Sequence, residues 1–170
     1  MSVSSFETST GKKSQQSSDV RQLVVFKIAE GSFGLDIQFV REINRLTQVT
    51  GIPTAPDYVD GIMNLRGAIV PVVNLGMRFG LDRTESTKDT RVVVIESGGH
   101  ILGLVVDEVS EVLRLAAKDV VPATNMATSG VNVDFIEGVG KVGDRLILLL
   151  DPSRLFSDEE KAELAELSTD

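Results

Sequence analysis

Short runs of β-branched and other apolar residues, separated by glycine, proline, asparagine and aspartate, fill the chain between its polar ends. Such runs are typical of β-strands, because β-branched side chains pack well on a pleated surface. The pattern therefore predicts a mostly β fold made of many short strands. The clearest strands are Leu23 to Ile28, Phe33 to Ile37, Ile69 to Val73, Val92 to Ile95, Ile101 to Val106 and Leu146 to Leu150.

Two glycine-bearing links join neighbouring runs. Residues 29–32 (Ala-Glu-Gly-Ser) and residues 97–100 (Ser-Gly-Gly-His) each have the length and composition of a hairpin turn. Pro71 interrupts one apolar run and has no backbone N–H to donate. We therefore expect that position at a sheet edge or at a bulge.

Helical signals are confined to two segments. Thr54 can cap a helix with Pro56 in its first turn and with Tyr58 and Ile62 on one face. Near the end of the chain, residues 157–160 (Ser-Asp-Glu-Glu) have the spacing of a capping box. They predict a short C-terminal helix with a weak apolar stripe.

The two ends of the chain differ from its middle. Seven of the first 18 residues are serine, a composition too polar to pack, so residues 1–20 are expected to form a disordered tail. Residues 158–170 form a short acidic helix and tail. Residues 21–157 remain as one domain, which the duplication described next divides into two lobes.

The middle of the chain contains an internal duplication. A shift of 69 residues places residues 24–53 on residues 93–122 with matching apolar, glycine, glutamate and proline positions. After an eight-residue insertion the shift becomes 77, and residues 61–79 fall on residues 138–156. Glycine, proline and glutamate do not replace one another in a strand pattern, so the agreement indicates a repeat. Each copy holds about five short strands, enough for a small barrel, and the two barrels share a core.

Only the first copy carries the Asn-Leu-Arg-Gly stretch at residues 64–67, and the second copy has Lys-Val-Gly-Asp there. A feature of one copy alone is a candidate for function. Glu42 can form a bidentate, charge-assisted contact with Arg66. Its counterpart Glu111 lacks an arginine at the equivalent position. Three interpretations stay open: Arg66 contacts a partner, fixes Glu42 from within, or simply lies on the surface.

Composition excludes several kinds of chemistry. The chain has no cysteine and one histidine, His100, so disulfides, thiolate chemistry and a His/Cys metal centre are excluded. Asp107, Glu108 and Asp151 lie beside strand ends, but nothing supplies the rest of an acid–base or metal site. No glycine-rich phosphate loop or nucleophile elbow is present. We expect no enzymatic activity, no cofactor and no metal.

Net charge and hydropathy limit which classes of partner and which cellular location are expected. The formal net charge is -8, and no clustered basic face is available for phosphates, so nucleic acid is not an expected partner. Residues 1–7 lack the basic and apolar regions of a signal peptide, and no run of 18 apolar residues follows. The sequence predicts a cytoplasmic protein without membrane insertion.

Four stretches resemble the CheW family of bacterial chemotaxis coupling proteins. They are residues 33–37 (Phe-Gly-Leu-Asp-Ile), 40–43 (Val-Arg-Glu-Ile), 61–75, which includes Asn-Leu-Arg-Gly and the strand with Pro71, and 105–113 (Val-Val-Asp-Glu-Val-Ser-Glu-Val-Leu). The similarity spans about residues 21–157. Arg91 departs from the family pattern, in which an apolar residue is expected.

This resemblance implies two intertwined SH3-like five-stranded barrels around a common core, with short helices and a C-terminal helix. It also implies a non-enzymatic adaptor that couples the cytoplasmic tips of chemoreceptors to the regulatory domain of the histidine kinase CheA in a ternary complex. The groove beside Arg66 and Glu42 is expected to contact the receptor, and the outer barrel edges the kinase. The positions matched to partner binding are Val40, Glu42, Gly61, Asn64, Arg66, Val109 and Val112.

Two alternatives are weighed. The chain can be a CheW-like regulatory domain of a larger kinase or of an adaptor fused to a receiver domain, since such domains share the fold. From a different class, an acidic two-barrel protein can bind or hydrolyse a small ligand, which requires a deep pocket with convergent polar groups.

Overall fold

The computed structural model describes residues 20–123 and 134–168. All six predicted strands are confirmed, and they lie in β1 (Val20–Ile28), β2 (Gly31–Asp36), β5 (Ala68–Asn74), β6 (Arg91–Ser97), β7 (His100–Val106) and β11 (Arg145–Leu150). Further strands are β3 (Val40–Arg45), β4 (Val59–Leu65), β8 (Glu108–Ala116), β9 (Val120–Pro122) and β10 (Ile136–Val142). The predicted tail of residues 1–20 lies outside the described residues except for Val20, which begins β1.

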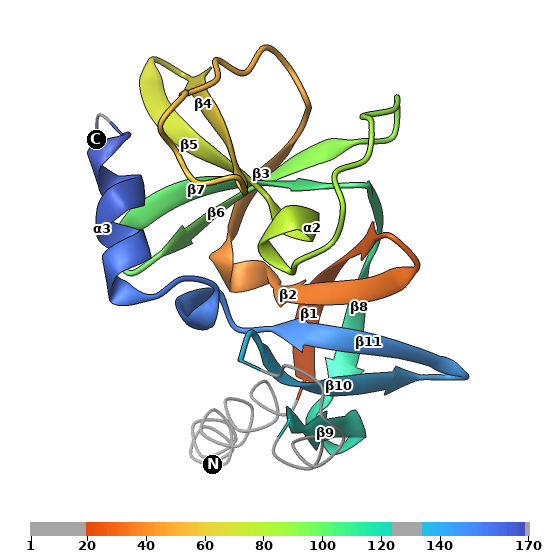
Figure 1. Cartoon of the computed structure of the whole chain (residues 1–170). Coiled ribbons are helices and arrows are strands. Elements are labelled where there is room, and N and C mark those ends of the chain that lie inside the picture. The colour runs from red at the N-terminus through yellow and green to blue at the C-terminus, as the bar shows by residue number, and fades with distance from the viewer. Residues whose placement is uncertain (1–19, 124–133, 169–170) are drawn as a thin grey trace, which may run out of the picture.

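The strands form two sheets, and each sheet makes one lobe (Figure 1). The five-stranded lobe has the strand order β3-β6-β7-β5-β4, and the six-stranded lobe has the order β8-β1-β2-β11-β10-β9. In each lobe, the chain segment that follows the outer strand β3 or β8 pairs with the strand at the opposite side of the sheet, β4 or β10. Thr50 forms a bridge with Ile62 of β4, and β9 pairs with β10. Both sheets are thereby curled in the manner expected of small barrels.

The predicted duplication is visible in this topology. The repeat relates β1 to β6, β2 to β7, β3 to β8, β4 to β10 and β5 to β11, and the two strand orders are then the same. The five-stranded lobe combines the first hairpin of the second copy with three strands of the first copy, and the six-stranded lobe combines the first hairpin of the first copy with four strands of the second, so the copies are intertwined. Even the bulges recur, between Val59 and Gly61 in β4 and between Ile136 and Gly138 in β10.

Three apolar clusters form the core, one inside each lobe and a larger one between the lobes. Alternate residues of β6 face opposite ways: Val92 and Val94 line the interior of the five-stranded lobe, whereas Val93 and Ile95 join a larger cluster between the lobes. In the six-stranded lobe, the residues of β1 divide in the same way between their own interior and the shared core. Both faces of these strands are buried, which explains why their sequences read as unbroken apolar runs.

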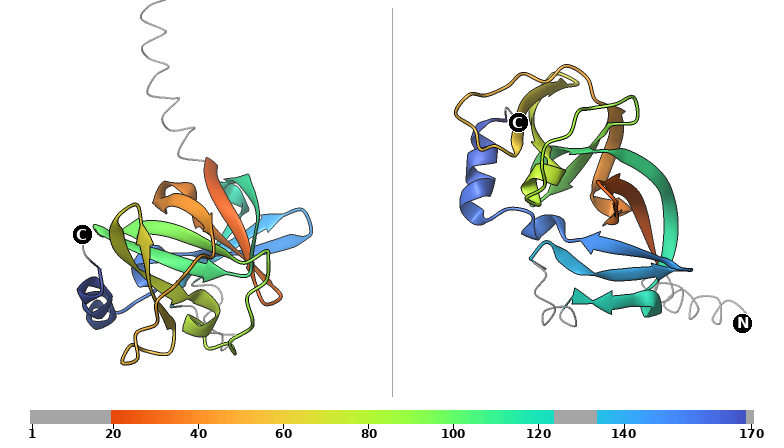
Figure 2. Two further views of the ribbon diagram at one scale, coloured as in Figure 1. Left: turned by 90° about the horizontal axis from the view of Figure 1, so that it is seen from above. Right: turned by 45° about the vertical axis from the view of Figure 1, so that its right-hand side comes forward.

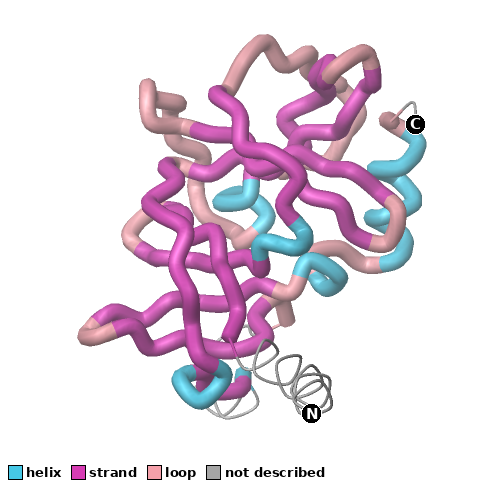
Figure 3. The backbone as a smooth tube through the Cα atoms, turned by 180° about the vertical axis from the view of Figure 1, so that it is seen from behind, coloured by secondary structure: helices cyan, strands magenta, loops and turns pink. Residues whose placement is uncertain are grey.

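Three short helical segments lie where the lobes meet (Figure 3), namely η1 (Ile37–Phe39), α2 (Leu75–Arg78) and η4 (Pro152–Arg154). The described part of the chain also contains the terminal helix α3 (Asp158–Glu166) and η2 (Ala117–Asp119), which lies at the far end of β8. Figure 2 shows α2 between the two lobes and α3 along the outside of the five-stranded lobe. The predicted capping box of α3 is confirmed, because Ser157 and Glu160 exchange backbone hydrogen bonds. Leu164 anchors α3 to the shared core.

The predicted helix that begins near Thr54 is wrong. Residues 53–58 form turns, and Tyr58 and Ile62 belong to the entry and the body of strand β4. Residues 53–57 suit a turn as well as a helix start. In the structure, the ladder of β4 with β5 and the bridge to Thr50 use the backbone donors and acceptors that a helix needs.

The expectation for Pro71 is also corrected. β5 is an interior strand, with β4 on one side and β7 on the other, so Pro71 lies at neither an edge nor a bulge. The ladder between β5 and β7 begins at Val72, one residue later. The missing N–H is tolerated because Pro71 has a strand partner on one side only.

No helix within residues 20–123 and 134–168 is long and apolar enough to cross a membrane.

Candidate functional site

The Asn-Leu-Arg-Gly stretch forms the tight turn of the hairpin between β4 and β5. Arg66 and Gly67 are its two central residues, with φ angles of 53° and 90°. Positive φ at both positions is the geometry of the two-residue hairpin turn that suits twisted strands. The side-chain carbonyl of Asn64 accepts a hydrogen bond from the Gly67 N–H at 2.9 Å and closes the turn.

Arg66 occupies a turn position that favours asparagine or glycine. A side chain with a positive φ is uncommon and disfavoured, and such strain is concentrated at functional sites. The turn also holds the Arg66 side chain away from the body of the lobe, and 78% of its surface is exposed. The backbone of the turn therefore presents a cation to solvent at a cost in local stability.

Glu42 of β3 forms an ion pair with the Arg66 guanidinium. The Arg66 Nε and Nη2 groups donate to the two carboxylate oxygens of Glu42, each at 3.2 Å, so the hypothesised bidentate pair is confirmed. Glu42 follows a bulge in β3, where the pairing with β6 skips Arg41 between Val40 and Glu42. The hydrogen bonds from Arg66 lower the pKa of Glu42, and a contact with Asn44 acts in the same direction.

We predict that Arg66→Ala raises the pKa of Glu42. Because the folded pKa is lowered, the attraction is present above the ordinary carboxyl pKa of 4.5 and is lost as the pH falls through the lowered value. An NMR titration of the Glu42 carboxyl carbon measures this. Arg41→Ala is the control and produces a smaller rise, since Arg41 contributes least among the causes of the shift. An unchanged Glu42 pKa in Arg66→Ala contradicts the pairing.

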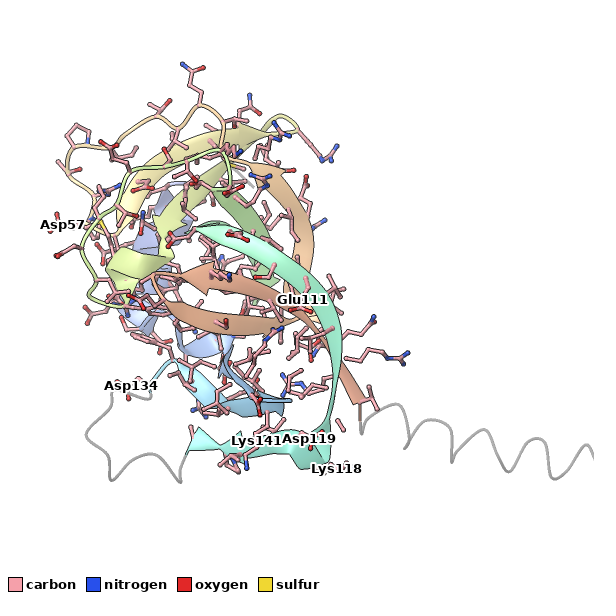
Figure 4. The ribbon with its side chains drawn as sticks, turned by 90° about the vertical axis from the view of Figure 1, so that its right-hand side faces the viewer. Asp57, Glu111, Lys118, Asp119, Asp134 and Lys141 are labelled. Carbon is pink, nitrogen blue, oxygen red and sulfur yellow. The ribbon has the colours of Figure 1, made fainter. Side chains whose placement is uncertain are left out.

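The second copy holds a similar pair, although its arginine does not occupy the position equivalent to Arg66. Arg145 Nη2 lies 2.8 Å from Glu111 Oε2, although the position equivalent to Arg66 is Gly143. The arginine stands two residues further on, across the turn between β10 and β11, at the place of Ala68 in the first copy. Figure 4 labels Glu111 on the long strand β8, above Lys141 of that hairpin. In each lobe, a carboxylate of the outer strand, β3 or β8, thus forms an ion pair with an arginine at a hairpin turn.

The other matched positions do not join a single surface. Val40 and Val109 are repeat counterparts, and both are partly buried against the shared core. Val112 has 52% of its surface exposed on β8. Of the seven residues, the structure brings together Glu42, Asn64 and Arg66 and places the others elsewhere.

Gly61 is buried where two backbone segments touch. Its φ is 146°, and a Cβ atom there would lie 1.9 Å from the carbonyl oxygen of Thr50. Next to it, Thr50 and Ile62 exchange two backbone hydrogen bonds of 2.9 Å. The geometry therefore requires glycine at residue 61 to close the five-stranded lobe.

A polar hollow adjoins the Asn-Leu-Arg-Gly turn. Asn64 forms its rim, and the remaining lining residues come from the loop after β3 and from β4 and β5, namely Thr47, Gln48, Thr50, Ile62, Met63 and Ile69. None of these side chains is charged. The hollow and the Arg66 guanidinium together form the surface that we call the turn site.

Two of the acidic residues singled out for chemistry, Asp107 and Asp151, have structural partners. Asp107 accepts a hydrogen bond of 2.7 Å from the Ala29 N–H at the β1–β2 turn. Asp151 caps η4 through Ser153 and pairs with Arg154. His100 is exposed at the start of β7. Within the part of the chain that the structure describes, no three His, Cys, Asp or Glu residues are placed to hold a metal ion.

Sequence reasoning missed a cluster between the lobes. The Arg78 guanidinium carbon lies 5.1 Å from the ring centroids of Tyr58 and Phe135 and 5.3 Å from that of Phe156. Arg78 also pairs with Glu160 of α3 at 2.9 Å. The 77-residue shift aligns Tyr58 with Phe135 and Phe79 with Phe156. Paired aromatic positions in both copies were the signal that could have revealed the cluster.

We predict that the Tyr58 phenol ionises at an unusually high pH. Burial raises the pKa of Tyr58 to about 12, and the charge of Glu160 adds to the shift. The chain has one tyrosine and no tryptophan, so an alkaline titration of ultraviolet absorbance follows this phenol alone. Stability from the buried neutral phenol is full below its ordinary pKa of 10.0 and is lost as the pH rises through about 12.

Unfolded chain is the control for this titration and should ionise near the ordinary value. Glu160→Gln should lower the midpoint of the folded protein, because it removes the second cause of the shift. A midpoint near 10.0 in folded wild-type protein contradicts the burial of Tyr58.

Comparisons with known proteins agree with the fold. The model of the CheW-like domain matches residues 22–160. The chemotaxis protein CheW of Klebsiella aerogenes is 36% identical over 142 residues, which cover 84% of this chain and 85% of that protein. CheW of Rhizobium meliloti is 35% identical over 141 residues, covering 83% and 90%.

A solved structure gives the same result. The crystal structure of the scaffolding protein TtCheW from Thermoanaerobacter tengcongensis superposes with a TM-score of 0.71 and 37% identity, and the match covers 77% of this chain and 88% of that one. The resemblance drawn from the four sequence stretches, the two-lobe fold and the adaptor class are thereby confirmed. This chain belongs to the CheW family of non-enzymatic chemotaxis adaptor proteins.

Proposed function

We propose that the chain works in the cytoplasm and binds two partners, the cytoplasmic tip of a chemoreceptor and the regulatory domain of the histidine kinase CheA. The observation that carries this proposal is the turn site. Arg66 is exposed and strained, and it is held by Glu42 beside an uncharged polar hollow. A surface of this kind suits a protein partner better than a small ligand, because arginine is a frequent anchor of protein interfaces.

Receptor contact is assigned to the turn site. The hollow next to Asn64 offers hydroxyl, amide and backbone groups, and Arg66 adds a cation at its rim. Kinase contact is assigned to an outer sheet edge, for which β8 is the candidate, because it is the first strand of its sheet and exposes Val112. An open strand edge is a common docking element.

The mechanism is scaffolding. Two surfaces on two lobes hold receptor and kinase together and raise their effective concentration without any chemistry. Signalling requires more, since an adaptor that binds active and inactive kinase equally cannot change their balance. At least one contact must therefore differ between the two states of the complex.

A pull-down tests the proposal. Immobilised wild-type protein should retain both a receptor signalling fragment and the kinase regulatory domain. Arg66→Ala should stay folded, because Arg66 is exposed, and should lose most of the receptor fragment. Arg41→Ala is the matched control, since Arg41 of β3 also forms an ion pair with a carboxylate, that of Glu96 in β6. Wild type that retains neither partner overturns the proposal, and full receptor binding by Arg66→Ala removes Arg66 from the site.

A second arrangement is favoured by one comparison. The chain is 28% identical to the chemotaxis protein CheV3 of Helicobacter pylori over 143 residues, but these cover only 46% of that protein. A CheW-like domain therefore also occurs as part of a longer chemotaxis protein. If this sequence is such a domain, the same two surfaces are present, and the pull-down gives the same result.

A further inference from the structure

Arg78 joins three parts of the molecule at one guanidinium. It ends α2, which follows β5 of the five-stranded lobe. The ring of Tyr58, at the entry to β4, belongs to the same lobe, whereas Phe135 precedes β10 of the six-stranded lobe. On the third side lie Phe156 and the start of α3.

The polar contacts of Arg78 are as specific as its ring contacts. Nε donates to the Leu155 carbonyl oxygen at 2.7 Å, and Nη2 donates to Glu160 Oε1 at 2.9 Å. The same Glu160 oxygen accepts the Ser157 N–H at 2.8 Å, so the capping box of α3 and Arg78 share one carboxylate. Only 20% of the Arg78 side chain is exposed. Cation–π and charge-assisted contacts are strongest when they are shielded from water in this way.

This cluster lies on the axis that relates the two copies. The tilted ring pair Phe79–Phe135, with centroids 5.4 Å apart, is the repeat equivalent of the tilted pair Phe156–Tyr58 at 5.8 Å. Arg78 itself corresponds to Leu155, and the two are in direct contact through the Leu155 carbonyl. The aromatic residues therefore occupy equivalent positions in the two copies, whereas the arginine is present in the first copy only. The Arg78 guanidinium contacts both lobes at once, through Tyr58 on one side and Phe135 on the other.

We propose that Arg78 is a positioning residue of the adaptor, which fixes the orientation of one lobe against the other and so couples binding at one lobe to binding at the other. This inference rests on the proposed function, because it needs two partners on two lobes. The receptor surface is on the five-stranded lobe and the kinase edge on the six-stranded lobe. A change of lobe orientation on binding one partner is then felt by the other, which is coupling between two sites in the thermodynamic sense.

The test compares Arg78→Leu with wild type. Leucine already occupies the equivalent place in the second copy, so it suits this environment. Arg154→Leu is the matched control, since Arg154 lies in the adjacent η4 and forms a local ion pair with Asp151, three residues before it. Arg78→Lys is a second variant that keeps the charge and loses the planar, multiply donating guanidinium.

Two measurements are made on each variant. The chain has no cysteine, so Lys88→Cys and Asp144→Cys place one spin label on an exposed position of each lobe for pulsed electron-spin distance measurement. Calorimetry gives the Kd of the receptor fragment and of the kinase domain, each with and without the other partner. The ratio of the two Kd values is the coupling factor, which is typically about 5–150-fold where sites are coupled.

For Arg78→Leu we expect a broader inter-lobe distance distribution, single-partner Kd values within about twofold of wild type, and a coupling factor near one. Arg154→Leu should match wild type, and Arg78→Lys should lie between. A purely structural role for Arg78 changes stability but leaves the coupling factor unchanged. An unchanged distance distribution or an unchanged coupling factor in folded Arg78→Leu overturns the proposal.

The spin-label measurement separates this inference from the proposed function. Wild type that binds neither partner refutes the function and with it the coupling role. The distance distribution still shows whether Arg78 fixes the lobes.

Discussion

Gly61→Ala is expected to lower the free energy of unfolding by about 3 kcal/mol or more, the largest effect of any single substitution proposed for this chain. Two causes add. Alanine does not readily adopt the φ of 146° at this residue, and its Cβ atom would lie 1.9 Å from the Thr50 carbonyl oxygen. The backbone of the five-stranded lobe must therefore open at its closing bridge. Urea unfolding followed by circular dichroism measures the change.

Gly67→Ala is the matched control for this prediction. Its φ is also positive, at 90°, but no atom lies within 4 Å of the added Cβ. Only the backbone preference is lost, at about 1 kcal/mol. Gly138→Ala, at the repeat counterpart of Gly61, places its Cβ 2.7 Å from the Val121 carbonyl oxygen and should fall between the two. Equal losses for Gly61→Ala and Gly67→Ala contradict the close-approach explanation.

A loss of partner binding in Gly61 variants is then a consequence of the fold. Gly61 was matched to a partner-binding position, but its surface is buried against Thr50. We propose that it supports the turn site indirectly, by holding β4 in the register that delivers Asn64 and Arg66 to the hairpin turn.

Reversing the charge of Arg66 is expected to weaken receptor binding by about tenfold or more. Arg66→Glu removes the exposed cation and places two carboxylates together where Glu42 now accepts two hydrogen bonds. Glu42→Arg should weaken binding in the same way, since two cations then face each other. Calorimetry with the receptor fragment measures both, with circular dichroism as the check on folding.

The double variant, Glu42→Arg with Arg66→Glu, distinguishes the open interpretations of Arg66. We expect it to restore most of the binding, because the pair that shapes the turn is rebuilt with its charges exchanged. No restoration means instead that the partner contacts the Arg66 guanidinium itself. The exchange of Arg41 and Glu96, another exposed pair between β3 and β6, is the control and should leave binding unchanged.

Much of the fold followed from local patterns. Val92 to Ile95 read as an unbroken apolar run, and the structure buries both faces of that strand. The shift of 69 and then 77 residues gave the two lobes, down to equivalent bulges at Gly61 and Gly138. Strand content and duplication are carried by nearest neighbours and by self-similarity, and both are visible in one sequence.

The errors arose where distant segments decide the local structure. Thr54, Pro56 and Tyr58 have a plausible helix spacing, yet the approach of Thr50 to Gly61 commits the segment to a strand. Glu111 finds Arg145 two residues beyond the equivalent position, because a hairpin turn brings both of its sides within reach of one long side chain. A strict position-by-position comparison of the copies cannot show this.

The position of Arg78 within its aromatic cluster was not predicted from the sequence, for a related reason. Its members Tyr58, Arg78, Phe135, Phe156 and Glu160 come from segments that meet only where the two copies cross. An arginine at the end of a short helix is usually exposed, and the contact between the lobes buries this one.

The most direct test of the central claim is a reconstituted kinase assay. Receptor signalling fragments assembled on vesicles and full-length CheA are mixed with or without this protein, and autophosphorylation of the kinase is followed. We predict that wild-type protein makes the kinase rate depend on the receptor, that Arg66→Ala does so weakly, and that Arg41→Ala behaves as wild type. A kinase rate that is the same with and without the wild-type protein contradicts the account.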